Sequence, residues 1–195
     1  MKIRRILPFS CSVLFACLLA QSAAAHTFGA QGAGFADGWL HPLTGADHVL
    51  AMVAVGIWAA QSGGRACWQV PLAFLLMMSA GAGLGRLGLP VAMLEVLIAG
   101  SVVGLGLLIG TSVRVSVRLS ILLVSAFALL HGYAHGLEIP ETAGPLDYAA
   151  GFLLATACLH GLGVGLGLLA RRSATVTRLG GAAIAFAGVY LLAGF

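Results

Sequence analysis

The sequence is poor in charged residues, which excludes an ordinary soluble domain. Only 8 % of its 195 residues are Asp, Glu, Lys or Arg, whereas 60 % are hydrophobic; soluble domains carry about 25 % charged residues. Such a chain is expected to cross a lipid bilayer as α-helices of about 20 residues each. Its long unbroken apolar runs also exclude a membrane β-barrel, whose strands alternate apolar and polar side chains.

Three other signals are missing, and each absence removes a class of function. The ten Lys and Arg residues are scattered, so the net charge of +4 forms no basic patch and predicts no nucleic-acid partner. No Walker motif is present, so ATP hydrolysis is not expected. The four cysteines lack Cys-x-x-Cys spacing, and we interpret Cys67 and Cys158 as small buried hydrophobic residues rather than parts of a disulfide framework.

Residues 1–25 are typical of a secretory signal peptide. Lys2, Arg4 and Arg5 form a charged start, an apolar stretch follows, and Ala23-Ala24-Ala25 fits the cleavage site. Cleavage would leave His26 as the first mature residue. The alternative is an uncleaved first helix.

Six further apolar segments follow, without a linker or a second domain between them. We therefore predict an all-α membrane protein, in which a cleavable signal peptide is followed by a bundle of six transmembrane helices over residues 26–195. Several segments are slightly short for a span, so tilt or a thin bilayer is expected. The segments are 39–61, 67–84, 89–110, 119–139, 148–170 and 179–195.

The cations between these segments predict the orientation. With the mature N-terminus outside the cytoplasm, the inner loops hold nearly all the arginines, as the positive-inside rule requires. The signal peptide gives the same orientation independently. The inner arginines are Arg65, Arg114, Arg118, Arg171, Arg172 and Arg178, and the outer one is Arg86.

Glycines within the segments are expected to let helices approach closely. Lipid supplies no hydrophobic force between helices, so packing through small residues must contribute. Gly100 and Gly104, and likewise Gly106 and Gly110, have the spacing for such contacts.

Two polar stretches interrupt the apolar segments and lie at the same depth in the predicted topology. One is in the outer half of the first segment and the other in the outer half of the fourth. In the second stretch, His131, His135 and Glu138 are spaced four and three residues apart and therefore share one helical face. His41 and His48, seven apart, are also expected on one face, with Pro42 and Gly45 distorting the helix start. The six ionisable residues are His41, Asp47, His48, His131, His135 and Glu138.

These residue types are ligands for transition metals. Imidazole nitrogen with carboxylate oxygen suits Ni²⁺, Co²⁺, Zn²⁺ or Cu²⁺, and intramembrane ionisable residues need partners or a cavity. We therefore predict a divalent-metal site formed by the six residues. A proton relay and purely structural hydrogen bonding are the alternatives.

Three more residues are candidates for secondary roles. Glu95 lies about 9 Å into the third segment at 1.5 Å per residue, where it is expected to be a ligand or to orient a histidine. His160, near the middle of the fifth segment, is a candidate for a permeation path, or else a structural residue. The amine and imidazole of His26 could chelate a metal together, although its terminal position equally follows from cleavage alone.

At these residues the chain resembles the HupE/UreJ family of bacterial nickel and cobalt transport proteins. The family has His, five residues and Asp-His in the first mature span, and His-Gly…His-Gly-x-Glu in the fourth. Leu130 stands where the family often has Phe, a difference that leaves the ligands untouched. The resemblance covers nearly the whole chain. The matching residues are His41, Asp47 and His48, then His131, Gly132, His135, Gly136 and Glu138.

The resemblance implies secondary transport of Ni²⁺, sometimes Co²⁺, through the bacterial inner membrane into the cytoplasm, to supply hydrogenase or urease. In that membrane, the orientation predicted from the signal peptide and the loop arginines places the mature N-terminus in the periplasm. The residues themselves support a divalent-metal pathway, with Zn²⁺ as another candidate ion. Two further hypotheses remain open: an intramembrane metal-dependent enzyme, for which no nucleophile–base pair is recognisable, and a metal-binding accessory protein for hydrogenase or urease assembly. We expect a transporter and not an enzyme.

Overall fold

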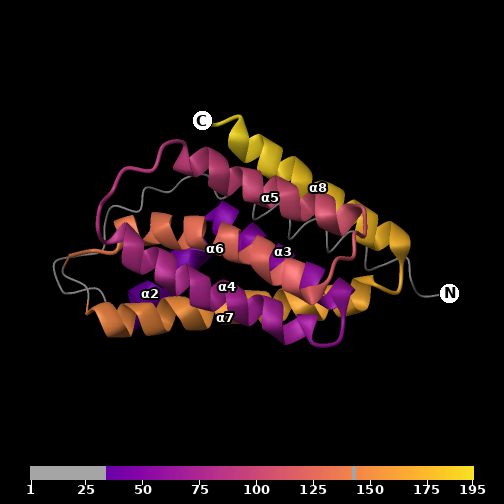
Figure 1. Cartoon of the computed structure of the whole chain (residues 1–195), viewed down its shortest axis with the longest axis horizontal. Coiled ribbons are helices and arrows are strands. Elements are labelled where there is room, and N and C mark those ends of the chain that lie inside the picture. Colours follow the sequence, from indigo (N-terminus) through magenta and orange to yellow (C-terminus); the bar gives the residue numbers. More distant parts are fainter. Residues whose placement is uncertain (1–33, 142–143) are drawn as a thin grey trace.

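The computed structural model describes residues 34–141 and 144–195. Within those two ranges the chain forms seven helices and no strand, which confirms the all-α expectation. The predicted signal peptide and His26 lie outside the described residues. The helices, shown in Figure 1, are α2 (Phe35–Thr44), α3 (Ala46–Ser62), α4 (Ala66–Gly85), α5 (Leu94–Gly110), α6 (Val117–Glu138), α7 (Pro145–Ala170) and α8 (Ala174–Leu192).

All six predicted segments are helical, but they are not six equivalent spans. Helices α4, α6, α7 and α8 are long and apolar enough to cross a bilayer, and the bent pair α2 and α3 is a fifth candidate if it counts as one span. Helix α5 is apolar but has only 17 residues, about 26 Å at 1.5 Å per residue, against a hydrocarbon core of about 30 Å. A span through α5 therefore stays a prediction.

The first segment is broken at Gly45, and its two halves meet at 85°. Gly45 has an extended backbone (φ −88°, ψ 116°) and caps both helices. The Thr44 hydroxyl donates to the His41 carbonyl (2.7 Å), which a continuing helix would bond to the amide of residue 45. The expected distortion near Pro42 and Gly45 is therefore present. The break turns α2 away from α3 and lays it against α7, with Gly38 in contact with Tyr148.

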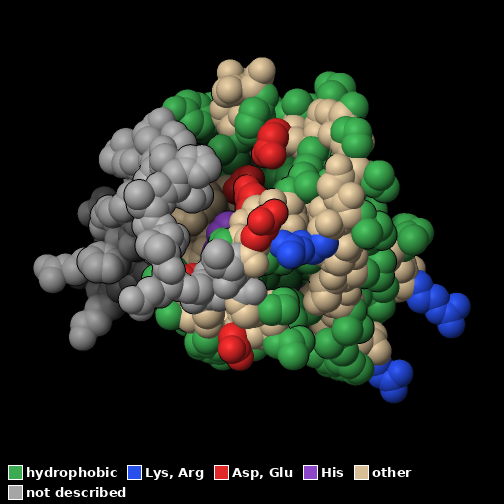
Figure 2. All heavy atoms as spheres, turned by 90° about the vertical axis from the view of Figure 1, so that its left-hand side faces the viewer, with side chains coloured by type: hydrophobic (Ala, Val, Ile, Leu, Met, Phe, Trp, Pro, Cys, Tyr) green, Lys and Arg blue, Asp and Glu red, His purple; other side chains and the backbone are tan. Residues whose placement is uncertain are grey.

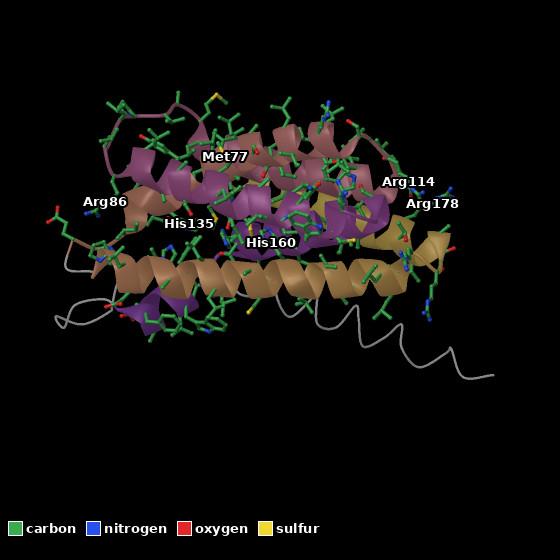
Figure 3. All side chains as sticks on the ribbon, turned by 60° about the horizontal axis from the view of Figure 1, so that its bottom comes forward. Met77, Arg86, Arg114, His135, His160 and Arg178 are labelled. Atoms are coloured by element: carbon green, nitrogen blue, oxygen red, sulfur yellow. The ribbon has the colours of Figure 1, made fainter. Side chains whose placement is uncertain are left out.

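The two ends of the bundle carry opposite charge. Each of the chain's six acidic residues lies at the end where α3, α5 and α7 begin, which we call the acidic end. Figure 2 shows this end, with an imidazole visible among acidic side chains. Figure 3 places Arg86 at the acidic end and Arg114 and Arg178 at the other, which we call the arginine end. The acidic residues are Asp37, Asp47, Glu95, Glu138, Glu141 and Asp147.

Helix α3 forms the centre of the core. Its side chains Met52, Val55 and Trp58 have no exposed surface, and the helix contacts α4, α5 and α7. The predicted burial of the two cysteines is less complete, because Cys67 is half-buried and Cys158 is exposed. Both are free thiols.

Glycines bring four pairs of the described helices into backbone contact: α4 with α6, α5 with α8, α3 with α7, and α2 with α7. A methyl group on Gly132 of α6 would overlap the Met78 carbonyl of α4, and one on Gly106 of α5 would overlap the backbone of Ala185 in α8. The contact predicted for Gly106 and Gly110 is thus confirmed. The prediction for Gly100 and Gly104 is wrong, because Gly100 has open space and Gly104 meets only the tip of the Phe127 ring at 3.7 Å. Spacing alone does not say which helical face meets a neighbour.

The Gly132→Ala substitution is expected to destabilise the protein by about 1–3 kcal/mol, as overpacking does. The Met78 carbonyl belongs to a helix backbone and cannot move without shifting α4 against α6. Gly100→Ala is the control, since the same methyl group there meets nothing within 4 Å. Thermal unfolding in detergent should show a lower midpoint for Gly132→Ala only. Equal midpoints for the two variants would contradict the packing argument.

Candidate functional site

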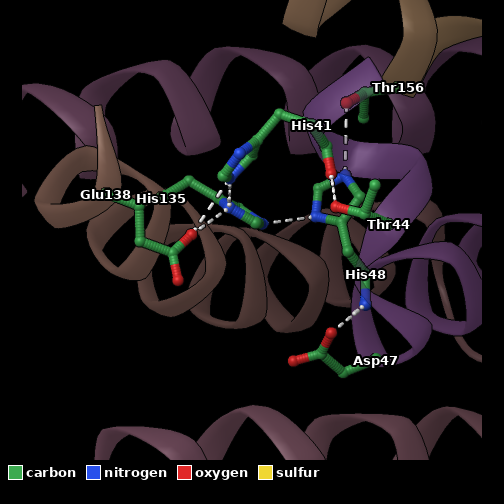
Figure 4. A network of polar contacts seen from close by, with 7 residues as sticks. All are labelled: His41, Thr44, Asp47, His48, His135, Glu138 and Thr156. Atoms are coloured by element: carbon green, nitrogen blue, oxygen red, sulfur yellow. Dashed lines mark hydrogen bonds and ion pairs between the residues drawn. The ribbon is translucent and has the colours of Figure 1, made fainter. Parts of the chain in front are cut away.

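Residues from α2 and α6 converge at the acidic end. His41 Nε2, His135 Nδ1 and Glu138 Oε2 lie 3.0 Å from one another in every pairing. We call these three atoms the ligand triangle; the three residues form the cluster in the described chain that can offer one ligand atom each to a single ion. Figure 4 shows the triangle with His48 of α3 joined to it through His135.

The triangle forms because of the break at Gly45. The sequence prediction that His41 and His48 share one helical face is wrong, since they belong to different helices at 85°. The bend still brings both side chains to His135, with ring centroids 5.0 Å away for His41 and 4.6 Å away for His48. His135 and Glu138 share one face of α6 as predicted.

Thr156 fixes the direction of the hydrogen bonds below the triangle. Its hydroxyl donates to the Phe152 carbonyl (2.9 Å), which can only accept. Thr156 Oγ1 therefore accepts from His48 Nε2–H (3.3 Å), and neutral His48 presents a lone pair on Nδ1. That lone pair accepts from His135 Nε2–H (2.8 Å). In the tautomer with a single proton on Nε2, the Nδ1 lone pair of His135 is directed into the ligand triangle.

The triangle suits a cation. With its lone pair directed at the Glu138 carboxylate oxygen 3.0 Å away, His135 Nδ1 forms a pair of acceptors whose repulsion is relieved by a proton or by a bound cation between them. Ligands about 2.1 Å from a metal and at right angles to each other are separated by about 3.0 Å, whereas tetrahedral ligands are about 3.4 Å apart. The 3.0 Å spacing is that of ordinary hydrogen bonds, and it is also compatible with three ligands at right angles around one ion.

The triangle lies at the boundary between solvent and the protein interior. The Glu138 side chain is 54 % exposed, whereas the side chains of His41 and His135 are 17 % and 15 % exposed. His48, the next histidine inward, is fully buried. An ion could therefore approach through the carboxylate and meet progressively less water as it passes the imidazoles.

His131 lies one helical turn below His135 and outside the triangle. Its ring contacts that of His48 at 5.9 Å. Because the Ser101 hydroxyl donates to the Ile98 carbonyl (2.6 Å), Ser101 Oγ accepts from His131 Nε2–H (3.0 Å). Four of the six predicted ligands, His41, His48, His135 and Glu138, are thus joined directly, and His131 extends the line inward.

The other predicted residues lie apart from the triangle. Asp47 accepts a hydrogen bond from the backbone N–H of His48 (2.7 Å), at the first turn of α3. Glu95 is exposed and has no hydrogen bond to a described residue, although it interacts electrostatically with Asp47 and Glu138. His160 is buried deeper in the bundle. His26 lies outside the described residues.

Sequence reasoning missed the residues that position the imidazoles. Phe152 of α7 contacts the rings of His41, His48 and His135, at centroid distances of 5.9, 5.3 and 4.9 Å. Thr156 and Ser101 each accept from one histidine. The one sequence signal was a lone hydroxyl residue within an apolar segment, and that type of residue usually bonds to its own helix.

Comparisons with known proteins identify the family of the chain. The HupE/UreJ protein family matches residues 14–191. Protein HupE of Rhizobium leguminosarum bv. viciae is 43 % identical over 185 residues, which cover 94 % of this chain and 96 % of that protein. No solved structure matches the chain. The family match and the identity over nearly the full length both show that the chain belongs to the HupE/UreJ family.

Proposed function

We propose that the protein is a secondary transporter that moves Ni²⁺, with Co²⁺ as a second substrate, through the bacterial inner membrane into the cytoplasm. The delivered metal would serve maturation of hydrogenase or urease, as the family resemblance implies. The observation that carries the proposal is the ligand triangle: two imidazole nitrogens and a carboxylate oxygen 3.0 Å apart, within a helical protein whose helices can cross a membrane.

The charge distribution supports entry at the acidic end. Among the described residues, six carboxylates against one arginine give that end a negative potential, which raises the local concentration of cations. The arginine end is rich in cations, and such loops stay in the cytoplasm. The proposed orientation therefore places the acidic end and the mature N-terminus in the periplasm, with α5 completing six spans.

The triangle can hold an ion without trapping it. Three ligands replace about half of an octahedral water shell, and Glu138 offsets part of the ion's charge. The remaining coordination positions can keep water, which makes release easier than from a closed site. Transport requires this balance, since a site that binds too tightly does not conduct.

A resident-metal enzyme is the second candidate. Two histidines and one carboxylate on one face of an octahedron also form the ligand set of mononuclear iron enzymes. Such an enzyme would retain its metal through purification, whereas a transporter would exchange it in seconds to minutes with free ion. A metal-binding accessory protein for hydrogenase or urease assembly would bind metal without moving it across a sealed membrane.

Uptake into proteoliposomes distinguishes these functions. Purified protein should admit radioactive Ni²⁺ above protein-free liposomes. A tenfold excess of Co²⁺ should inhibit at least about fivefold and the same excess of Mn²⁺ less than about twofold, because nitrogen ligands bind Mn²⁺ most weakly. Zn²⁺ is tested alongside them. Uptake no higher than in protein-free liposomes would contradict transport.

A further inference from the structure

His160 of α7 is a buried histidine without a hydrogen-bond partner. It is 2 % exposed, and neither of its ring nitrogens bonds to any described residue. Figure 3 places it deeper than His135, between the acidic end and the arginine end of the bundle. Its two nitrogens are therefore in the membrane interior, where polar groups are costly to leave unpaired.

The two other fully buried histidines show what a structural role requires. His48 bonds to Thr156 and His131 bonds to Ser101, so each has a hydroxyl partner supplied by another helix. His160 has none in the part of the chain that the structure describes. A leucine would fill this position without leaving a polar group unpaired, so packing does not account for the imidazole.

His160 lies next along the line of imidazoles that starts at the ligand triangle. It is one helical turn below Thr156 on α7, about 6 Å along the axis, and Thr156 accepts from His48. His48 and His160 are close enough to interact electrostatically. The fully buried ring of Phe74 contacts both His131 and His160, at 6.0 and 5.2 Å. Phe74 therefore contacts one histidine of the upper group, His131, and also His160.

The backbone around His160 is fixed. A methyl group on Gly56 of α3 would overlap the His160 carbonyl, and one on Gly163 would overlap the carbonyl of Val53. The two helices are thus held backbone to backbone at this level. No hydrogen bond to a described residue anchors the imidazole ring at this level.

We propose that His160 is an inner binding station for the transported divalent transition-metal ion, reached from His48 and His131 past the ring of Phe74. This inference rests on the proposed transport function. A single neutral imidazole offers one lone pair, so the ion is held more weakly here than at the ligand triangle and moves on toward the arginine end. The ring of Phe74, which contacts His131 and His160, borders the path between the two stations.

Two substitutions at His160 test the station in proteoliposomes. His160→Leu should lower Ni²⁺ uptake at least about tenfold, while Ni²⁺ affinity measured by calorimetry, which reports the ligand triangle, stays within about twofold. His160→Cys offers a thiolate in place of the imidazole and should raise the ratio of Cd²⁺ to Ni²⁺ uptake at least about tenfold, because thiolates prefer softer ions. Cys158→Ala, an exposed position on the same helix, is the control and should match the wild type.

The outcomes separate the station from the transport proposal. Wild-type Ni²⁺ uptake in His160→Leu, with uptake lost in His135→Ala, would overturn the inner station and leave the transport proposal intact. Wild-type uptake in both variants would remove the proposed function of the site as well. An unchanged Cd²⁺ to Ni²⁺ ratio in His160→Cys would leave His160 a structural residue and overturn the proposal. The Cd²⁺ to Ni²⁺ uptake ratio of His160→Cys also tests the inner station if the His160→Leu protein fails to fold.

Discussion

His135→Ala is expected to lower Ni²⁺ uptake at least about 100-fold, the largest effect of any single substitution in the chain. Loss of a residue that only supports a metal ligand costs about 10–100-fold, and His135 does more than that. Its Nδ1 belongs to the ligand triangle, and its Nε2–H donates to His48. Removing the ring therefore breaks the contacts through which His41 and Glu138 are joined to the buried histidine His48.

Two further variants separate lost chemistry from lost folding. His135→Gln keeps an N–H donor in reach of His48 but offers no imidazole lone pair, so uptake should fall nearly as far as in His135→Ala. Tyr133→Phe, two residues away on α6, removes a buried hydroxyl that has no described partner and should transport as the wild type does. Uptake is compared at equal amounts of folded protein. Near wild-type uptake in His135→Gln would show that the ring only supports the fold.

Most of the fold could be predicted from the sequence, because the dominant forces there are local. Apolar segments of nearly span length must be helical in lipid, since each backbone amide needs a partner, and all six segments are helical. The relative placement of the helices could not be predicted. Gly106 and Gly132 lie in close contacts whereas Gly100 does not, and sequence spacing does not show which face of a helix meets its neighbour.

The site shows the same division between local and long-range information. The face shared by His135 and Glu138 follows from helical periodicity and is present. The position of His41 depends on the 85° bend at Gly45, whose angle is set by how α2 packs on α7. Three of the residues predicted from the sequence, His41, His135 and Glu138, lie together, but the predicted arrangement of the first helix is wrong. The hydroxyl partners of the histidines come from other helices, so no pattern within one segment could identify them.

The line of imidazoles also links binding to location in the membrane. Exposure falls from Glu138 through His135 to His48, so an ion that moves inward along the proposed path loses contact with water. Carboxylates gather at the acidic end, where they attract cations, while neutral imidazoles line the interior, where a fixed negative charge would hold a dication too tightly. In the proposed transporter, this order of residue types would favour entry of the ion over its retention.

Glu138→Gln is expected to weaken Ni²⁺ binding about 10–100-fold, the second-largest effect. The substitution keeps the size of the side chain and one acceptor oxygen, but it removes the negative charge that the triangle supplies to the ion. Glu141→Gln is the matched control, since Glu141 is exposed at the same end and makes the same change in net charge without belonging to the triangle. Calorimetry on the purified variants measures both affinities.

The comparison between these two carboxylates decides whether the triangle or the general field of the acidic end binds the ion. A field effect acts through solvent, so it weakens as salt rises above about 0.1 M, where the screening length is about 10 Å. Direct coordination by Glu138 is screened much less. Ni²⁺ binding by the Glu138→Gln variant should therefore remain weak at high salt. Any loss of Ni²⁺ affinity in Glu141→Gln should disappear there. Equal losses in the two variants, both abolished by salt, would mean that Glu138 attracts the ion without binding it.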